Sequence, residues 1–101
     1  MAIAEMTIVI VGGSASMSEP LADVIKLVDA SGLRYHVGPM GTVVQGDADS
    51  LISLFQKCHK AAMGKVERAF STITIDERKG ADTPMDTKVK SIEKKLGKKL
   101  N

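Results

Sequence analysis

The stretch that decides the fold is residues 33–46, LRYHVGPMGTVVQG. Its two ends, 33–37 and 42–46, each predict a short β-strand. The GPMG segment between them (38–41) combines a proline with two glycines, which mark a turn or a sharp bend. The stretch therefore predicts two consecutive strands joined by a tight connection.

The segment before this stretch predicts a strand and then a helix. Residues 2–11 are rich in β-forming side chains and are largely apolar on both sides of the strand. Such a strand is typical of a sheet that is covered on both faces. From Ser18 onward, apolar residues recur at helical spacing, and Gly32 is expected to stop the helix. The stripe of this helix is Leu21, Val24, Ile25 and Val28.

The segment after the stretch predicts a second helix and a fourth strand. Asp47 or Asp49 can cap a helix that ends at Gly64. Residues 66–75 alternate in polarity and end in β-branched side chains, which favours a strand. The stripe of the second helix is Leu51, Leu54, Phe55, Cys58 and Ala62.

A third helix is predicted after a polar loop at 76–82. Thr83 can serve as its cap, Pro84 suits the first helical position, and Asp86 completes a start that resembles a capping box. The apolar stripe of this helix is Met85, Val89, Ile92 and Leu96.

The order of elements predicts the fold class. A strand, helix, strand, strand, helix and strand fit an α+β, ferredoxin-like βαββαβ sandwich with a four-stranded antiparallel sheet, to which a C-terminal helix is added. We expect one domain over residues 1–101. This fold covers only one face of its sheet, whereas the strand at 2–11 is apolar on both. A second copy of the chain is the simplest cover for the other face, so a homo-oligomer is expected.

Composition and charge narrow the possible functions. The chain has only three aromatic residues and no apolar run long enough to cross a membrane, and its N-terminus has no basic leader. Residues 88–101 carry six lysines against one glutamate, a net charge of +5, which leaves −3 on the rest. Few aromatics are available to stack on bases, so we interpret the lysines as a solvated helix face and expect no nucleic-acid partner. The lone Cys58 fits a cytoplasmic location.

Catalytic and metal-binding patterns are weak. Cys58 and His59 are adjacent on a predicted helix, so their side chains diverge and do not form a shared metal site. The serines of the segment 12–16, GGSAS, lie near a helix start without a nucleophile-elbow motif. That segment can bind an anion through backbone N–H groups, or it can be only a loop and a cap. We therefore expect no enzymatic activity, no cofactor and no metal.

The motif at residues 35–46, YHVGPMGTVVQG, resembles the hallmark of the small YkoF-like thiamine-binding family. In that family Pro-Met-Gly-Thr is followed by two aliphatic residues, an acidic residue and glycine. Further matches are the loop at 14–18, Asp76-Glu77-Arg78 at the end of the last strand and Lys88-Val89 in the terminal helix. The resemblance spans nearly the whole chain in the same order.

The resemblance implies a ferredoxin-like subunit that forms homodimers or homotetramers. It also implies non-catalytic binding of thiamine or its hydroxymethylpyrimidine moiety, linked to thiamine salvage or transport. The alternative is a ferredoxin-like domain that senses an effector or oligomerises to regulate a partner protein.

The resemblance also suggests candidate ligand-binding residues. They are Tyr35, Met40, Thr42 and Gln45, with Ser14 and Ser16 as a second group. Gln45 stands where the family usually has glutamate; an amide can hydrogen-bond an aminopyrimidine but brings no charge to a thiazolium. Met40 is alternatively only part of the bend, and Tyr35 only a core or interface residue. Strand alternation places Thr42 and Gln45 on opposite faces of the sheet, so we expect that not all four contact one ligand.

Overall fold

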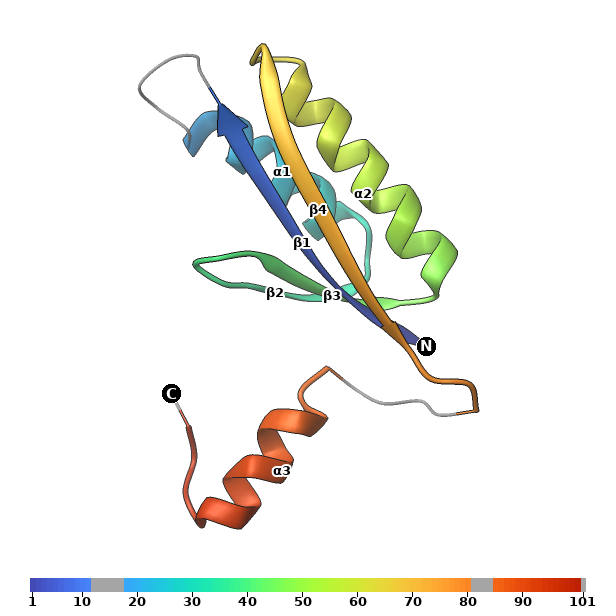
Figure 1. The fold of residues 1–101 in the computed structure, drawn as a ribbon, viewed down its shortest axis with the longest axis vertical. Helices are drawn as coiled ribbons and strands as arrows, with labels where there is room; N and C mark the ends of the chain where they lie inside the picture. Colours follow the sequence, from blue (N-terminus) through green and yellow to red (C-terminus); the bar gives the residue numbers. More distant parts are fainter. Residues whose placement is uncertain (12–17, 81–84, 101) are drawn as a thin grey trace.

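The structure is a computed structural model that describes residues 1–11, 18–80 and 85–100. The predicted order of elements is confirmed (Figure 1). The elements are β1 (Ala2–Val11), α1 (Ser18–Ala30), β2 (Arg34–Val37), β3 (Thr42–Gly46), α2 (Ala48–Met63), β4 (Arg68–Glu77) and α3 (Thr87–Leu96).

The four strands form one antiparallel sheet in the order β2-β3-β1-β4. Strand β4 pairs with β1 along its whole length, from Ala2 opposite Glu77 to Val11 opposite Arg68. Strand β3 pairs only with the first half of β1, and the last pair joins Met6 and Thr42. This topology is the predicted ferredoxin-like α+β fold.

The core lies between the sheet and the two helices α1 and α2, which pack against each other. From β1, Ala2, Ala4 and Met6 point into it, and Val44 does so from β3. The helices supply the remaining fully buried side chains, among them Val28, Leu51 and Cys58. Because the aromatic content is low, aliphatic side chains fill this core, as the sequence predicts.

The start of α2 is set by Asp47, one of its two predicted caps. The Asp47 carboxylate accepts hydrogen bonds from the Ser50 backbone N–H at 3.0 Å and from the Ser50 hydroxyl at 2.6 Å. These two bonds lower the pKa of Asp47, because both favour its charged form. Gly64 follows the last turn as its C-cap.

Some predicted boundaries are wrong. Strand β4 runs from Arg68 to Glu77 rather than over 66–75, so it includes the first residues of the predicted 76–82 loop. Strand β2 begins at Arg34, one residue later than predicted. Helix α3 begins at Thr87 rather than at Pro84, and Asp86 makes no side-chain cap bond. The Asp86 carboxylate instead forms ion pairs with Arg34 at 3.2 Å and Lys90 at 2.9 Å. The ion pair with Arg34 thus engages the carboxylate that the capping-box pattern assigns to the helix start. The other two residues of that predicted start, Thr83 and Pro84, lie outside the described residues.

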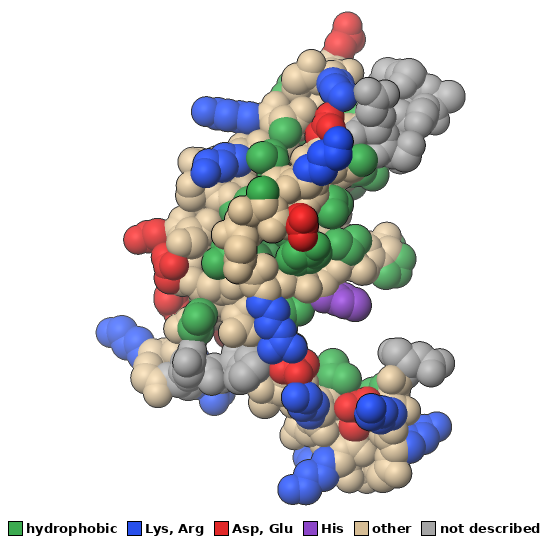
Figure 2. Space-filling model, turned by 180° about the vertical axis from the view of Figure 1, so that it is seen from behind, with side chains coloured by type: hydrophobic (Ala, Val, Ile, Leu, Met, Phe, Trp, Pro, Cys, Tyr) green, Lys and Arg blue, Asp and Glu red, His purple; other side chains and the backbone are tan. Residues whose placement is uncertain are grey.

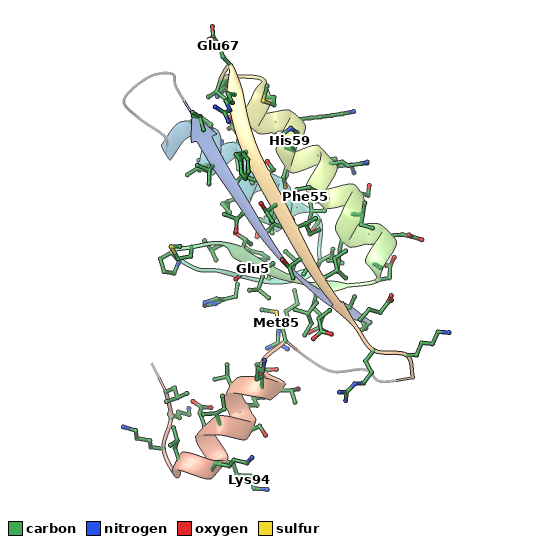
Figure 3. All side chains as sticks on the ribbon, viewed as in Figure 1. Glu5, Phe55, His59, Glu67, Met85 and Lys94 are labelled. Atoms are coloured by element: carbon green, nitrogen blue, oxygen red, sulfur yellow. The ribbon has the colours of Figure 1, made fainter. Side chains whose placement is uncertain are left out.

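One face of the sheet, here called the open face, carries no helix (Figure 1). The side chains that β1 presents on this face are mostly apolar, with some polar ones among them. Phe70 of β4 lies beside Val9 on the same face and is 61% exposed. Figure 3 shows Glu5 near the middle of this sheet. The sequence shows apolar side chains on both sides of β1. Within a single chain, only those on the helical side are buried.

Helix α3 lies apart from the rest of the fold, beyond one end of the sheet (Figure 1). None of its residues is buried. Figure 2 shows lysine side chains distributed over the lobe that it forms. Within the described residues, no helix is long and apolar enough to span a membrane.

Candidate binding cleft

The candidate site is a cleft that arises where β3 stops following β1. Beyond the Met6–Thr42 pair, β1 continues to Val11 and, within the described part of the chain, pairs there with β4 alone. The β2–β3 hairpin ends at that point and leaves the edge of β1 uncovered from Thr7 onward. Helix α1 lies across the helical side of this gap, so the sheet edge, the hairpin tip and α1 enclose a hollow.

The cleft has a volume of about 320 Å³. Its walls are mainly apolar: Leu21, Val24 and Ile25 from α1, Met6 and Ile8 from β1, and Pro39 and Met40 from the hairpin tip. Among the described residues of the lining, Thr7 and Thr42 bear hydroxyl groups and none has a titratable side chain. A hollow with apolar walls and a few polar groups is typical of small-molecule sites.

The hairpin tip is held against β1 by a close approach at Gly41. The Gly38 N–H donates to the Gly41 carbonyl oxygen at 2.9 Å, which closes the turn. The Thr7 hydroxyl donates to the Met40 carbonyl oxygen at 3.2 Å. A Cβ atom at Gly41 would lie only 3.0 Å from Thr7 Oγ1 and 3.1 Å from the Met6 carbonyl oxygen. Glycine at this position therefore lets the hairpin touch β1 and form one wall of the cleft.

Two of the predicted site residues, Met40 and Thr42, meet in this cleft. Met40 is 83% exposed at the tip of the hairpin, where its side chain is available to a ligand. Thr42 is a buried polar residue, 8% exposed, on the face that the helices cover. Its position beside Met6 places a hydroxyl-bearing side chain at the inner part of the lining.

Tyr35 lies on the same face of the sheet as Thr42 but is not part of the cleft lining. Its hydroxyl donates to Asp29 Oδ1 of α1 at 2.8 Å. This bond raises the pKa of the Tyr35 hydroxyl, because the carboxylate beside it favours the neutral phenol. Its ring packs against the core, so in this chain Tyr35 joins β2 to α1.

Gln45 lies on the opposite, open face of the sheet, as strand alternation predicts. It is paired across strands with Arg34 on one side and Ile3 on the other. Its Oε1 accepts a hydrogen bond from the Met85 N–H at 2.7 Å. Figure 3 shows Met85 at the junction between the sheet and α3. The structure therefore separates Gln45 from the cleft. Ser14 and Ser16 lie outside the described residues.

The other reactive groups of the described chain occupy structural positions. Cys58 is fully buried, and burial raises the pKa of its thiol to about 11. His59 Nδ1 lies 2.6 Å from Ser71 Oγ, a contact that joins α2 to β4. Among the residues that the structure describes, no three His, Cys, Asp or Glu side chains are grouped so that they could hold a metal ion.

The contribution of α1 to the cleft was not predicted from the sequence. Leu21, Val24 and Ile25 were interpreted only as the core stripe of a helix, and Val24 is indeed buried. The available signal was the width of that stripe, because a helix whose adjacent positions 24 and 25 are both apolar has apolar surface beyond one narrow contact line.

A second hollow of about 380 Å³ lies between the end of α1 and the start of α2. It is shallower, and its lining includes Asp49, Ser50, Ser53 and Lys57. Its mixed charge and wide opening make it a weaker candidate than the cleft.

Comparison with known proteins assigns the chain to a family. A family model described as "Thiamine-binding protein" matches residues 4–93. The UPF0045 protein YqgV of Bacillus subtilis is 34% identical over an alignment of 102 positions, which covers 95% of this chain and 98% of that protein. The UPF0045 protein MJ1052 of Methanocaldococcus jannaschii is 32% identical over 90 residues, covering 89% of this chain and 90% of that protein.

Solved structures of similar proteins share the fold. The crystal structure of MJ1052 superimposes with a TM-score of 0.82 at 32% identity and covers 90% of this chain and 94% of that one. A domain of unknown function, DUF77, from Bacillus cereus gives a TM-score of 0.81 at 25% identity, with coverages of 87% and 86%.

Proposed function

The chain belongs to the thiamine-binding protein family, and on that premise we propose that it binds thiamine or its hydroxymethylpyrimidine moiety in the cleft between α1 and the β2–β3 hairpin. Binding is not accompanied by a reaction. The observation that carries this proposal is the meeting of Met40 and Thr42, both from the family-like motif, in one apolar cleft.

The character of the lining supports a flat heteroaromatic ligand. Apolar side chains of α1 and β1 can cover the faces of a ring, and the Met40 thioether is well suited to contact with one. The Thr42 hydroxyl can donate or accept a hydrogen bond at the ring edge. The volume of about 320 Å³ is at the lower end of the range for small-molecule sites, which suits a single substituted ring.

The electrostatics of the lining favour the neutral pyrimidine over intact thiamine. The described residues that line the cleft include no carboxylate, and Gln45 faces the other side of the sheet. The cationic thiazolium of thiamine would therefore leave water without gaining an opposite charge, which is costly. We propose that the pyrimidine occupies the cleft and that the thiazolium, where present, remains in solvent.

The same proposal includes the cellular setting. The protein serves thiamine salvage or transport as a cytoplasmic homodimer or homotetramer. The free, buried Cys58 is compatible with a reducing compartment. The open face, with its exposed Phe70, supports self-association and is the observation that favours the second candidate, an oligomerising or effector-sensing domain that regulates a partner.

Calorimetric titration with hydroxymethylpyrimidine and, separately, thiamine tests the proposal. We expect saturable heat with both compounds, a tighter dissociation constant for the pyrimidine, and a rise in melting temperature, because a ligand that binds only the native state stabilises it. Absence of heat and of any thermal shift from either compound at millimolar concentration would contradict the proposal. Co-purification of a protein partner, without a response to either compound, would favour the second candidate.

A further inference from the structure

The cleft contains a strand edge that the sheet leaves unpaired. Strand β3 stops pairing with β1 at Met6, whereas β1 continues to Val11 beside β4 (Figure 1). Thr7, Ile8 and Val9 all belong to the cleft lining. Consecutive side chains of a strand point to opposite faces of the sheet, so three neighbours share one lining only where the strand edge itself forms part of the wall. Main-chain groups of β1 therefore take part in the cleft.

The hydrogen bond at the hairpin tip determines which main-chain groups of β1 face this edge. The Gly38 N–H donates to the Gly41 carbonyl oxygen at 2.9 Å, so these residues are a hydrogen-bonded pair of the β2–β3 ladder. Such pairs alternate with pairs that are not hydrogen-bonded, so the main-chain groups of Thr42 face away from β2 and towards Met6 of β1. The register of β1 with β4 is uninterrupted, and the same alternation therefore turns the N–H and C=O of Ile8 towards the cleft.

These two groups of Ile8 have no partner strand. Within the described residues, β1 pairs beyond Met6 with β4 alone, which lies on its other edge. The Ile8 side chain packs against the core and holds this part of the strand in place. A ligand that fills the cleft removes water from the edge, and main-chain groups that lose water without a new partner are costly. A well-matched ligand therefore offers the edge one acceptor and one donor.

The chemistry of an aminopyrimidine matches this requirement. Its ring nitrogen is an acceptor and the amino group beside it is a donor, so one edge of the ring resembles the edge of a neighbouring strand. Side chains of the described chain do not offer the same pair to the cleft, because the Thr7 hydroxyl donates to the Met40 carbonyl oxygen and Gln45 lies on the open face. Thr42 lies two residues back along the ladder from Ile8, about 6.8 Å, where its hydroxyl can meet a second polar group of the ligand.

We propose that the N–H and C=O of Ile8 hydrogen-bond the amino edge of the pyrimidine ring, an inference that rests on the proposed function of the cleft. The Ile8 N–H donates to the ring nitrogen, and the amino group donates to the Ile8 carbonyl oxygen. The ring lies in the plane of the sheet, where β3 would continue, with one face against Leu21 and Val24 of α1. The ligand class is therefore flat rings with an amino group beside a ring nitrogen, and this selectivity does not depend on the side chain at position 45.

Hydrogen exchange at the Ile8 amide, followed by NMR, tests the contact directly. With hydroxymethylpyrimidine at about a hundredfold excess over its dissociation constant, this exchange should slow at least about tenfold, because it then requires release of the ligand. The matched control is Ile73 of β4. Its cross-strand partner Met6 faces β3, so the Ile73 N–H faces the outer edge of the sheet, and its exchange should change less than about twofold. Equal rates at Ile8 with and without bound ligand would overturn the inference.

Two isosteres of hydroxymethylpyrimidine test the two bonds separately. One carries methyl in place of the amino group, and the other carries C–H in place of the neighbouring ring nitrogen. Each keeps the shape of the ring and removes one bond. Calorimetry should show each isostere binding at least about tenfold more weakly than the parent, because one desolvated main-chain group is left without a partner. If both bind as tightly as the parent, the inference is wrong while the proposed function stands.

A main-chain ester at position 8 connects the protein group to the ligand group. It replaces the Ile8 N–H by oxygen and keeps the side chain. The ester should weaken binding of the parent about tenfold or more and binding of the C–H isostere less than about twofold, because that isostere does not use the donor. The same ester at Ile73 is the control and should bind the parent normally. Equal weakening of both ligands by the ester at position 8 would contradict the assigned pair.

The remaining outcomes are also decisive. If neither hydroxymethylpyrimidine nor thiamine binds, the proposed function fails and this inference fails with it. If the amides of Ile8 and Ile10 are both protected without ligand and lose that protection on dilution, the strand edge pairs with another chain instead, and the inference is overturned.

Discussion

Gln45 Oε1 accepts a hydrogen bond from the Met85 backbone N–H at 2.7 Å, which ties the start of α3 to the open face of the sheet. The two residues are 40 positions apart in the chain. Thr42, only three positions before Gln45, points to the helical face and lines the cleft. The family-like motif therefore contributes to two parts of the fold. Its Thr42 lies in the candidate binding site, and its Gln45 holds the start of the terminal helix.

Substitution of Gln45 should affect α3 and leave the cleft unchanged. Gln45→Ala removes the acceptor for Met85, so backbone amides at the start of α3 should exchange faster, corresponding to a local loss of about 1 kcal/mol. Gln45→Glu keeps an acceptor and should retain slow exchange. Hydrogen exchange measured by NMR checks both variants, and calorimetry should give the wild-type preference between pyrimidine and thiamine. A changed preference in Gln45→Glu would place this side chain in the ligand site.

Thr42→Val should weaken ligand binding with little effect on the fold. Valine has nearly the same volume but lacks the hydroxyl, so the substitution removes one hydrogen bond to the ligand. An unmet buried partner costs roughly 1–3 kcal/mol, which is about fivefold to over a hundredfold in affinity. Calorimetric titration measures the loss. Tyr35→Phe, which removes only the bond to Asp29 outside the cleft, is the control and should bind normally.

Gly41→Ala should displace the hairpin tip and destabilise the protein. The new Cβ would meet Thr7 Oγ1 at 3.0 Å and the Met6 carbonyl oxygen at 3.1 Å, and backbone atoms cannot easily give way. Overpacking of this kind typically costs about 1–3 kcal/mol. Urea unfolding measures the cost, and ligand affinity should fall with it. Gly64→Ala is the matched control, because its φ of −64° is helical and its nearest contact would be an ordinary 3.4 Å.

The tether of α3 should weaken in acid. The hydrogen bonds of Asp86 to Lys90 and Arg34 hold its pKa at about 2, below the ordinary value of 3.8. A depressed pKa in the folded state means that the contribution is fully present above pH 4 and is lost as the pH falls towards 2. NMR titration of the Asp86 carboxyl should show the low midpoint, and 1 M salt should move it upward by screening. An ordinary midpoint at low salt would contradict the Arg34–Asp86 and Lys90–Asp86 pairs.

Cys58 should be unreactive in the folded protein. Its thiol is fully buried and its pKa is raised to about 11, two units above the ordinary 9.0, so the thiolate is about a hundredfold scarcer at pH 8. Labelling with a chromogenic disulfide reagent at pH 8 should be slow in buffer and fast in concentrated urea. Fast labelling of the native protein would show that the α1–α2 contact opens readily.

The sequence by itself determined the elements and their order. The β-rich apolar run of β1, the stripes of α1 and α2 and the Asp47 cap are local patterns, and each can be recognised from a few neighbouring residues. The order of elements then leaves few topologies, because crossovers are right-handed and connections are short. The opposite orientation of Thr42 and Gln45 also followed from strand alternation alone.

Only the tertiary structure decided where these side chains meet other elements. The cleft exists because β3 leaves β1 after the Met6–Thr42 pair, which depends on how long the hairpin is and on the close contact that Gly41 permits. Asp86 occupies the N-cap position of α3, but its carboxylate makes no cap bond and instead pairs with Arg34, a residue 52 positions away. Pairings across such distances depend on the geometry of the folded sheet, and no local spacing in the sequence specifies them.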